Sequence, residues 1–399
     1  NQRKKRASQM GGEEKLERHH QQGKINARDR IESLVDQGTF TEIGKLVDGG
    51  VDALVAGIGM VDGRPVAIGS EDFTVRGGSI GRAESTKRYR IAELALQERI
   101  PLIMLLEGAG HRPPLPNDPP TTRTPGDLQA QAEASGKIPF VVAVLGPSAG
   151  HGALSAPLAD FSIMTEKASI FTAGPPLVKA SLGEDITKEE LGGPTVALQS
   201  GVIHNLAHGD EEALSQVKRW LSYLPSSAWE HPPKAEPSTG KRRVEELLDI
   251  IPDNPRHSYD MKNVIQVIMD EESFFEIQPI FGASLITGFA RLGGRSVAIV
   301  ANQPQHLAGS INVDAADKAT QFIQVADAFH MPLVTTNFKL GSFEIKTLVK
   351  GVLSRIKHKI SNPLSCSAKS ISFPIYLLNT VTLILFFNCF QSTKSLATF

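Results

Sequence analysis

The sequence predicts an α/β layered fold that occurs twice in one chain, with the second copy incomplete. Residues 57–69 (GIGMVDGRPVAIG) and 288–300 (GFARLGGRSVAIV) match at an offset of 231 residues. The match continues without a gap over residues 57–102 and contains thirteen identical positions, where ordinary composition gives about three by chance. A repeat of this length is too long for a solenoid unit and indicates two homologous domains.

Length and composition fit two globular domains. The chain has 399 residues, of which 41% are hydrophobic and 21% charged, and its net charge is −1. We therefore expect no nucleic-acid partner. The two cysteines, Cys366 and Cys389, cannot form a disulfide framework or a zinc site, so we expect no metal and a reducing compartment, cytoplasmic or the mitochondrial matrix in a eukaryote. No apolar stretch follows the basic N-terminus, so no secretory signal is expected.

The first elements are an arm and a set of β-hairpins. Residues 1–36 are charged and helix-like, and we expect them to pack as an arm on the first domain. Residues 40–69 contain short β-rich runs, and the pair Asp62-Gly63 between two of them is typical of a tight hairpin turn.

A helix and a buried strand follow. Residues 80–99 have helical periodicity, with the apolar side chains on one face and Lys87 and Arg88 off it. Pro101 is expected to end this helix, and residues 102–106 form a fully apolar strand that runs into glycines. The order strand, strand, helix, strand indicates a layered α/β fold.

The same pattern then recurs. Residues 127–135 are predicted to be helical, residues 140–145 to form a buried strand, and residues 146–153 to form the turn after it. Asp210 is predicted to cap a further helix that Pro225 closes.

Composition changes mark the domain boundaries. We expect a first domain over residues 37–230 and a linker rich in Pro and Ser over 231–256. A partial second domain then spans 257–337, and a tail of different composition spans 338–399.

The glycine-rich turns are the candidate chemical sites. A buried strand that ends in glycines and leads into a helix leaves backbone N–H groups unpaired, and two such amides form an oxyanion hole. Gly150-His151-Gly152 is the best candidate for this role, and Gly108–Gly110 is the second. The alternative interpretation is that both segments are only tight turns.

A hydrolase is the rival interpretation of the same segment. Residues 146–150 match the G-x-S-x-G nucleophile elbow after an apolar strand, with Ser148 as nucleophile and Asp210 and His231 as conceivable triad partners. Two features oppose it: Pro147 restricts the strained elbow geometry, and a hydrolase does not explain the internal repeat.

Several segments together resemble one family, the carboxyltransferase (β) subunits of biotin-dependent acyl-CoA carboxylases, which include propionyl-CoA and methylcrotonyl-CoA carboxylases. The resemblance covers residues 25–334 in the family's order. The segments that carry it are Ala27–Ile31, Asp72–Ser79, Gly146–Phe161, Thr172–Pro175, Gly183–Gly193, Val300–Pro304 and Leu307–Gly309.

The resemblance implies a fold and a set of partners. It implies a crotonase-like fold with two ββα-spiral domains, the first for acyl-CoA and the second for carboxybiotin. The site forms between subunits, so a homo-oligomer (a dimer or a trimer of dimers) is expected. Biotin would be carried by a partner, a biotin carboxylase or biotin carboxyl carrier subunit, and no metal is expected on this chain.

The resemblance also implies site residues. The amides of Gly150 and His151 correspond to the pair that stabilises the thioester enolate, although the family more often has glycine at the position of His151. The remaining residues implied to bind acyl-CoA are Arg76, Gly77, Gly78, Ser79, Gly108, Gly110, Arg112 and Gly152. The His151 ring either packs without a role or enters the acyl pocket.

Two further expectations concern chemistry. In the family, the freed ureido nitrogen of biotin takes the α-proton of acyl-CoA, so no protein base is demanded. Three basic residues, Arg82, Lys87 and Arg88, either meet the CoA phosphates or lie on a solvated helix face, and we leave them out of the site.

The last part of the chain departs from the family after residue 334. At the repeat offset, Gly150 and His151 map onto Val381 and Thr382, and residues 352–399 contain no glycine. We expect the apolar run at residues 371–390 not to anchor the chain in a membrane, because polar residues and a proline interrupt it.

Two functional hypotheses remain: a carboxyltransferase subunit, or an inactive remnant that only binds acyl-CoA. For this polypeptide alone, we expect little or no turnover.

Overall fold

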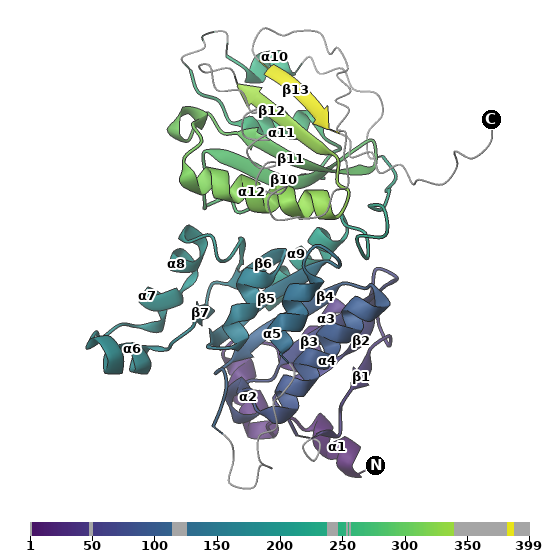
Figure 1. Cartoon of the computed structure of the whole chain (residues 1–399), viewed down its shortest axis with the longest axis vertical. Coiled ribbons are helices and arrows are strands. Elements are labelled where there is room, and N and C mark those ends of the chain that lie inside the picture. The colour runs from purple at the N-terminus through teal and green to yellow at the C-terminus, as the bar shows by residue number, and fades with distance from the viewer. Residues whose placement is uncertain are drawn as a thin grey trace, which may run out of the picture. The chain divides into compact units, whose positions relative to one another are not determined.

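The computed structural model describes residues 2–47, 51–113, 126–237, 246–252, 254, 257–338 and 381–386. The chain divides into two units, Asn1–His231 and Pro232–Phe399, which are described separately. Figure 1 labels their helices and strands.

The elements of the first unit, in chain order, are α1 (Gln2–Ser8), α2 (Glu13–Gln21), α3 (Ala27–Leu34), β1 (Thr41–Ile43), β2 (Leu54–Val61), β3 (Arg64–Glu71), η2 (Arg76–Gly78), α4 (Arg82–Glu98), β4 (Leu102–Gly108), α5 (Asp127–Ala134), β5 (Phe140–Ala149), η3 (Gly152–Leu158), β6 (Phe161–Thr165), β7 (Ser169–Phe171), α6 (Pro175–Leu182), α7 (Lys188–Gly192), α8 (Pro194–Gln199), β8 (Asn205–Ala207) and α9 (Asp210–Leu221).

The N-terminal arm is helical, as its charged sequence predicted. Helix α3 begins after Asn26, whose side-chain oxygen accepts hydrogen bonds from the first backbone amides of the helix. Ile31 and Leu34 of α3 are fully buried. Arg30 is buried beside them, so this helix contributes both apolar packing and a charged group to the interior.

One eight-stranded sheet forms the centre of the first unit, with the order β1-β2-β3-β4-β5-β6-β8 and β7 paired with β5. Strands β2 and β3 form an antiparallel hairpin, whose turn at Asp62 and Gly63 has positive φ angles at both residues. This is the turn that the sequence predicted. From β3 onward the neighbouring strands are parallel, so their carboxyl ends meet at one edge of the sheet.

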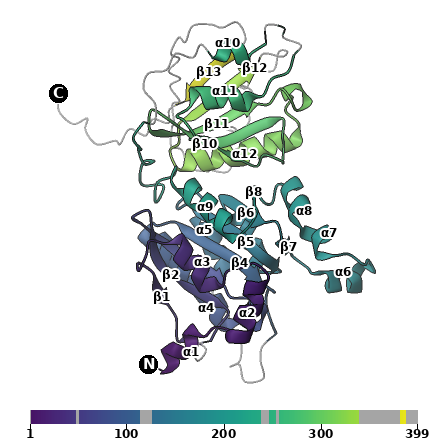
Figure 2. The same cartoon turned by 180° about the vertical axis from the view of Figure 1, so that it is seen from behind.

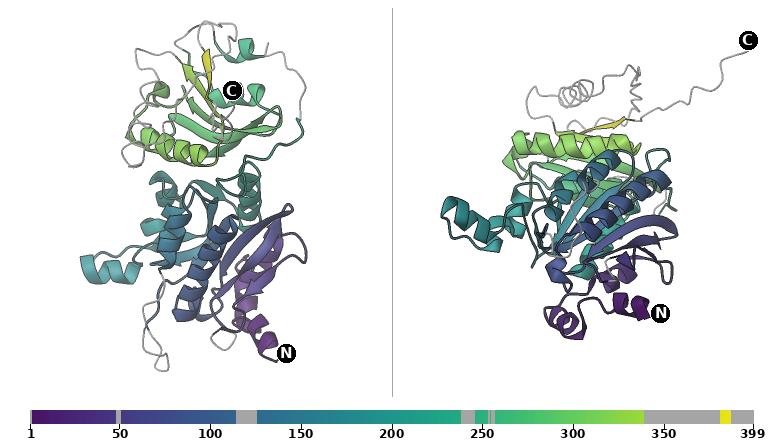
Figure 3. Two further views of the ribbon diagram at one scale, coloured as in Figure 1. Left: turned by 45° about the vertical axis from the view of Figure 1, so that its right-hand side comes forward. Right: turned by 60° about the horizontal axis from the view of Figure 1, so that its bottom comes forward.

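Helices cover both faces of this sheet (Figures 1 and 2). Leu102, Met104 and Leu106 of β4 pack in one core with apolar side chains of α4 and α5. Because side chains alternate along a strand, Ile103 and Leu105 point to the opposite face, where α3 and α9 lie. The short helices α6, α7 and α8 extend away from the sheet in the views of Figure 3.

Three local predictions for the first unit were wrong. Strand β5 continues to Ala149, so the turn begins at Gly150 rather than at Gly146. Gly209, not Asp210, is the N-cap of α9, because the Asp210 carboxylate accepts a hydrogen bond from Arg30 instead, at 2.8 Å. Helix α9 ends at Leu221, before Pro225.

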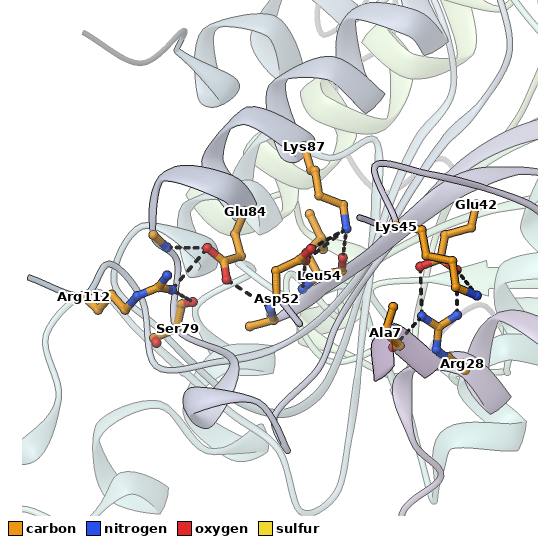
Figure 4. Close-up of polar contacts among 12 residues, drawn as sticks. Ala7, Arg28, Glu42, Lys45, Asp52, Leu54, Ser79, Glu84, Lys87 and Arg112 are labelled. Carbon is orange, nitrogen blue, oxygen red and sulfur yellow. Dashed lines mark hydrogen bonds and ion pairs between the residues drawn. The ribbon is translucent and has the colours of Figure 1, made fainter. Parts of the chain in front are cut away.

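The charged side chains of α4 also differ from expectation. Lys87 and Arg88 are 6% and 0% exposed, so neither lies on a solvated helix face nor is available to CoA phosphates. The ammonium of Lys87 donates to both carboxylate oxygens of Asp52 and to the carbonyl of Leu54 (Figure 4). Burial is tolerated because each charge has partners in hydrogen-bond geometry.

The elements of the second unit are α10 (Leu247–Ile250), α11 (Met261–Ile268), β9 (Phe275–Ile277), β10 (Leu285–Leu292), β11 (Arg295–Asn302), η4 (Leu307–Gly309), α12 (Val313–Ala328), β12 (Leu333–Phe338) and β13 (Val381–Phe386). Helix α10 lies within the range predicted as a linker.

The second unit repeats the first with the offset seen in the sequence. Leu54 pairs with Glu71 and Val61 with Arg64 in the first hairpin. The equivalent pairs 231 residues later are Leu285 with Asn302 and Leu292 with Arg295. A short 3-10 turn, a long helix and a parallel strand follow both hairpins at the same offset. The predicted duplication of the strand–strand–helix–strand unit is therefore present in the structure.

The sheet of the second unit has the order β13-β12-β11-β10-β9. Ile286 and Ala290 of β10 pack in one core with α11, whereas Phe289 points to the other face and its ring lies 5.1 Å from that of Phe322 in α12. Strand β13 pairs antiparallel with β12. Apart from residues 338 and 381–386, the predicted tail lies outside the described residues, as does most of the apolar run at 371–390.

Within the parts of the chain that the structure describes, none of the helices combines the length and the apolar character that a membrane span requires.

Candidate functional site

Three glycine-containing turns of the first unit meet at the carboxyl edge of its sheet. They follow β3, β4 and β5, which are adjacent parallel strands. The amide of Ala109 donates to the carbonyl of Gly77 at 3.0 Å, and the amide of Ile80 donates to the carbonyl of Gly110 at 2.7 Å. Ligands of open parallel sheets bind at this edge, so the structure brings the predicted turns together where a site is expected.

Glycine is required at two of these positions because the backbones approach closely. A Cβ on Gly78 would lie 2.2 Å from the carbonyl oxygen of Glu107, and the φ angle of Gly78 is +67°. A Cβ on Gly110 would lie 2.8 Å from the carbonyl oxygen of Ala149, and its φ angle is +81°. The turns after β3, β4 and β5 therefore pack backbone against backbone.

Arg112, in the turn after β4, forms hydrogen bonds with the loop after β3 and with α4. Its guanidinium donates to the carbonyl of Ser79 at 2.8 Å and to the Glu84 carboxylate at 3.2 Å (Figure 4). Of the predicted acyl-CoA residues, Arg112 is thus engaged within the protein. Arg76 is exposed and lies in the same loop as Ser79.

Of the two predicted oxyanion amides, one already donates a hydrogen bond within the protein. The amide of Gly150 donates to the carbonyl of Phe171 at 2.9 Å, continuing the pairing of β5 with β7. The amide of His151, directly before η3, has no acceptor among the described residues. A backbone amide that has no acceptor at the start of a helical turn is suited to an anionic oxygen.

The His151 side chain is held by a carboxylate that was not predicted. Its Nε2 lies 2.7 Å from Oδ1 of Asp127, the first residue of α5. Burial alone would raise the pKa of Asp127, but the hydrogen bond from His151 and the charge of Arg88 hold it at about 2. Asp127 is therefore ionised and accepts a hydrogen bond from Nε2 of His151. The His151 ring also lies 4.3 Å from the ring of His111, centre to centre.

Arg88 connects this pair to the interior of the sheet. Its Nε donates to Asp127 at 2.9 Å, while its two terminal nitrogens donate to Glu71 and to Ser155, each at 2.7 Å. The second carboxylate oxygen of Glu71 accepts the backbone amide of Glu107 at 2.8 Å. Burial raises the pKa of Glu71, and the charge of Arg88 opposes that rise.

The carboxylate of Glu107 contacts three side chains of the N-terminal arm, the cations Lys24 and Arg30 and the imidazole of His19. Lys24 lies 2.5 Å, Arg30 2.7 Å and His19 3.1 Å from its carboxylate oxygens. Burial alone would raise the pKa of Glu107, but the hydrogen bond from His19 and the charges of Arg30 and Lys24 lower it to about 2. A continuous polar path therefore runs from the arm to His151.

The hydrolase interpretation fails on geometry. Ser148 lies within β5, is 0% exposed, and its hydroxyl has no partner among the described residues. Asp210 is bound to Arg30, and His231 is exposed at the end of the first unit. A nucleophile elbow requires an exposed serine at a sharp turn, so Ser148 is a strand residue and not a nucleophile.

Sequence reasoning missed Asp127, Glu71, Glu107 and His111. Asp127 lies in a predicted helix, whereas Glu71 and Glu107 come just after predicted strands. Only contacts across the sheet reveal the partners of these three carboxylates. One signal was available for His111, since it lies between two predicted site residues, Gly110 and Arg112.

The sequence predicts that the second unit lacks a turn corresponding to that of Gly150 and His151. At the repeat offset, the equivalents of Gly150 and His151 are Val381 and Thr382, which form the start of β13 and pair with Phe338 and Asn337. The described residues of the second unit thus hold a strand at this place and not an amide turn. We derive no chemical step through biotin from these residues.

Comparison with known proteins identifies the family. The carboxyl transferase domain family matches residues 18–338. The chain is 36% identical over 351 residues to the carboxyltransferase subunit of propionyl-CoA carboxylase from Haloferax mediterranei, covering 84% of this chain and 67% of that protein. It is 37% identical over 338 residues to the 12S subunit of methylmalonyl-CoA carboxyltransferase from Propionibacterium freudenreichii subsp. shermanii, covering 81% and 64%.

Solved structures share the fold. The crystal structure of the transcarboxylase 12S hexamer with hydrolysed methylmalonyl-CoA matches with a TM-score of 0.78 at 35% identity, covering 84% of this chain and 69% of that chain. A single-chain, multi-domain long-chain acyl-CoA carboxylase matches with a TM-score of 0.73 at 27% identity, covering 88% and 38%. These neighbours confirm the predicted crotonase-like α/β fold class.

The resemblance found in the sequence, to carboxyltransferase subunits of acyl-CoA carboxylases, is confirmed by the same relatives. The chain spans about two thirds of the length of the curated relatives it matches. It belongs to the carboxyl transferase domain family.

Proposed function

We propose that the first unit is the acyl-CoA half of a carboxyltransferase, which transfers a carboxyl group from carboxybiotin to the α-carbon of an acyl-CoA. The observation that carries this proposal is the meeting of three strand-end turns beside the amide of His151, which has no acceptor among the described residues. The relatives supply the substrate class, because their names state action on propionyl-CoA and methylmalonyl-CoA.

The chemistry of this unit is the stabilisation of negative charge on a thioester oxygen. The His151 amide donates to that oxygen as the α-carbon loses its proton, which favours the enolate over the thioester. Gly110 and Gly78 let the turns after β3, β4 and β5 pack closely around this amide, because neither position carries a Cβ. Biotin, when bound, supplies the carboxyl group.

The partners follow from the same proposal. The 12S relative is described as a hexamer and as a multienzyme core, and we infer a homo-oligomer with a separate biotin-bearing subunit for this chain. The predicted compartment, cytoplasmic or mitochondrial matrix, rests on the two cysteines alone and stays a prediction.

Binding of propionyl-CoA to the full chain, measured by isothermal titration calorimetry, tests the proposal. We expect saturable binding that Gly110→Ala weakens at least about tenfold, because its Cβ would crowd the turn after β5. Gly63→Ala is the matched control, since Gly63 has a φ angle of +73° with open space around it and lies in the hairpin turn. Absence of binding, or equal losses in both variants, would refute the site.

Turnover is a separate measurement on the same protein. Biotin-dependent decarboxylation of methylmalonyl-CoA decides whether this chain acts as a carboxyltransferase by itself or only binds acyl-CoA, as the incomplete second repeat predicts.

A further inference from the structure

We propose that His151 is a general base for acyl-CoA bound to the first unit. Its imidazole removes the α-proton reversibly without biotin, so the chain catalyses exchange of the α-hydrogens with solvent. This inference rests on the proposed function, because it uses the same acyl-CoA site. It adds an activity and a catalytic residue that carboxyl transfer does not demand.

The covalent structure of His151 places the base beside the oxyanion donor. The backbone amide that donates to the thioester oxygen and the imidazole belong to one residue, so the ring lies within one side chain's length of that oxygen. The α-carbon is bonded to the thioester carbonyl carbon and is therefore close to the same ring. The ring is 27% exposed, which leaves it accessible from the site.

Asp127 selects the tautomer that a base requires. Its ionised carboxylate accepts a hydrogen bond from Nε2–H, with 2.7 Å between Nε2 and Oδ1. The lone pair of the neutral imidazole is therefore on Nδ1. Asp127 is itself 2% exposed and fixed by Arg88 at 2.9 Å, so the ring has a defined orientation. A carboxylate orients the base of a catalytic triad in the same way. Asp127 is thus a positioning residue.

His111 provides a route for the proton to solvent. It is exposed, and its ring contacts that of His151 at 4.3 Å. Burial and the charge of His151 both lower the pKa of His111, so His111 stays neutral beside a protonated His151. A neutral imidazole can accept a proton and release another to water.

The exchange step is balanced without an additional reactant. The α C–H bond breaks and an N–H bond forms on Nδ1, while the electron pair moves into the enolate whose oxygen the His151 amide holds. The proton on the imidazolium exchanges for a deuteron from heavy water, directly or through His111. Return of that deuteron to the α-carbon restores the thioester.

The test is deuterium uptake by propionyl-CoA with the full chain in heavy water, without biotin, followed by mass spectrometry. We expect uptake well above that of the protein-free solution. His151→Ala and His151→Gln should each lower the rate about 100-fold, the scale of a general base. Both variants keep the backbone amide, so the affinity for propionyl-CoA should stay within a few-fold. In His151→Gln the side-chain amide can still donate to Asp127.

His208→Gln is the matched control. His208 also lies 2.7 Å from a carboxylate, Glu166, but its side chain is 84% exposed and distant in sequence from the turns of the site. A general effect of removing a carboxylate-bound histidine would appear in this variant as well. We expect its exchange rate to equal that of the unmodified protein.

A comparison of rate with affinity separates positioning from a structural role. The groups that face His151 are Asp127 and His111, with Arg88 behind Asp127 and Glu71 behind Arg88. Asp127→Asn removes the carboxylate that selects the tautomer, so it should lower the exchange rate while the affinity for propionyl-CoA stays within a few-fold. A purely structural role would reduce binding and rate together.

The outcomes distinguish the two proposals. Binding of propionyl-CoA with no deuterium uptake, or equal uptake by His151→Ala and the unmodified protein, overturns the base and leaves the acyl-CoA site standing. No binding at all overturns both.

Discussion

Lys87 and Lys318 make the same contact in the two units. Each lies 231 positions from the other, and each ammonium donates to the carbonyl of the first residue in the hairpin, Leu54 and Leu285 respectively. Their remaining partners differ. Lys87 has the carboxylate of Asp52, whereas Lys318 has the carbonyl of Gln278 at 2.6 Å. The duplicated fold thus retains a buried cation at one place but pairs it with a carboxylate in the first unit and a carbonyl in the second.

This difference predicts that removal of the charge destabilises the first unit much more than the second. Lys87→Met leaves the carboxylate of Asp52, 4% exposed, without its cation, and should destabilise the first unit by about 3–5 kcal/mol. Lys318→Met removes a charge that only carbonyl groups accept, and should change the stability of the second unit little at neutral pH. Urea-dependent hydrogen exchange of the two hairpins measures both effects, and a large loss in Lys318→Met would contradict the account.

Lys318 also predicts a pH dependence. Burial lowers its pKa to about 8, below the value of about 10.4 in an unfolded chain. The unfolded state therefore binds more protons between these values, and the stability of the second unit should rise with pH from about 8 to 10. Lys318→Met should remove this rise, which amounts to about 3 kcal/mol at most. An identical pH dependence in both proteins would show that another group is responsible.

Arg88 and Arg90 of α4 form a matched pair for testing the buried network. Arg88→Lys replaces a planar fork with a single ammonium that cannot reach Glu71, Asp127 and Ser155 together, and should cost about 2–4 kcal/mol. Arg90 is 50% exposed and contacts Glu93 alone, so Arg90→Lys should leave stability unchanged. Fluorescence of Trp220, which is fully buried in the first unit, reports unfolding in urea. Equal midpoints for the two variants would argue against the network.

Glu107 should control attachment of the N-terminal arm. Its pKa of about 2 lies below the value of about 4.3 in an unfolded chain. Its contribution to stability is therefore fully present above that unfolded value and is lost as the pH falls towards 2. Glu107→Gln leaves Lys24, Arg30 and His19 without their shared carboxylate at any pH, and trypsin should then cleave α2 and α3 faster.

Glu14→Gln is the control for this experiment, because Glu14 pairs with Arg18 in the same arm at 87% exposure of its side chain. We expect its cleavage pattern to match that of the unmodified protein. Acid sensitivity that persists in Glu107→Gln would assign the effect to a different carboxylate.

The hairpins and the repeat could be predicted because their determinants are local. The Asp62-Gly63 turn needs only two residues that tolerate positive φ, and both have it. The repeat needs only a comparison of the sequence with itself. The register of both hairpins agrees with the offset read from identical residues.

The buried charges could not be predicted in this way. Helical periodicity assigns Arg88 to a face but does not show what that face meets, and its partners Glu71 and Asp127 come from other elements. The amide of Gly150 is a similar case, because its acceptor, Phe171, belongs to the strand after next. Only the three-dimensional pairing of strands reveals these contacts.

The fork of Arg88 has a consequence for how this protein can diverge. Its three acceptors come from a strand, a helix and a 3-10 turn, and each nitrogen serves one of them. Replacement of Glu71, Asp127 or Ser155 alone would leave one nitrogen of the buried Arg88 guanidinium without a hydrogen-bond acceptor. Replacements at these positions are therefore expected to arise as linked sets, and the imidazole at position 151 to be inherited together with the acid at 127.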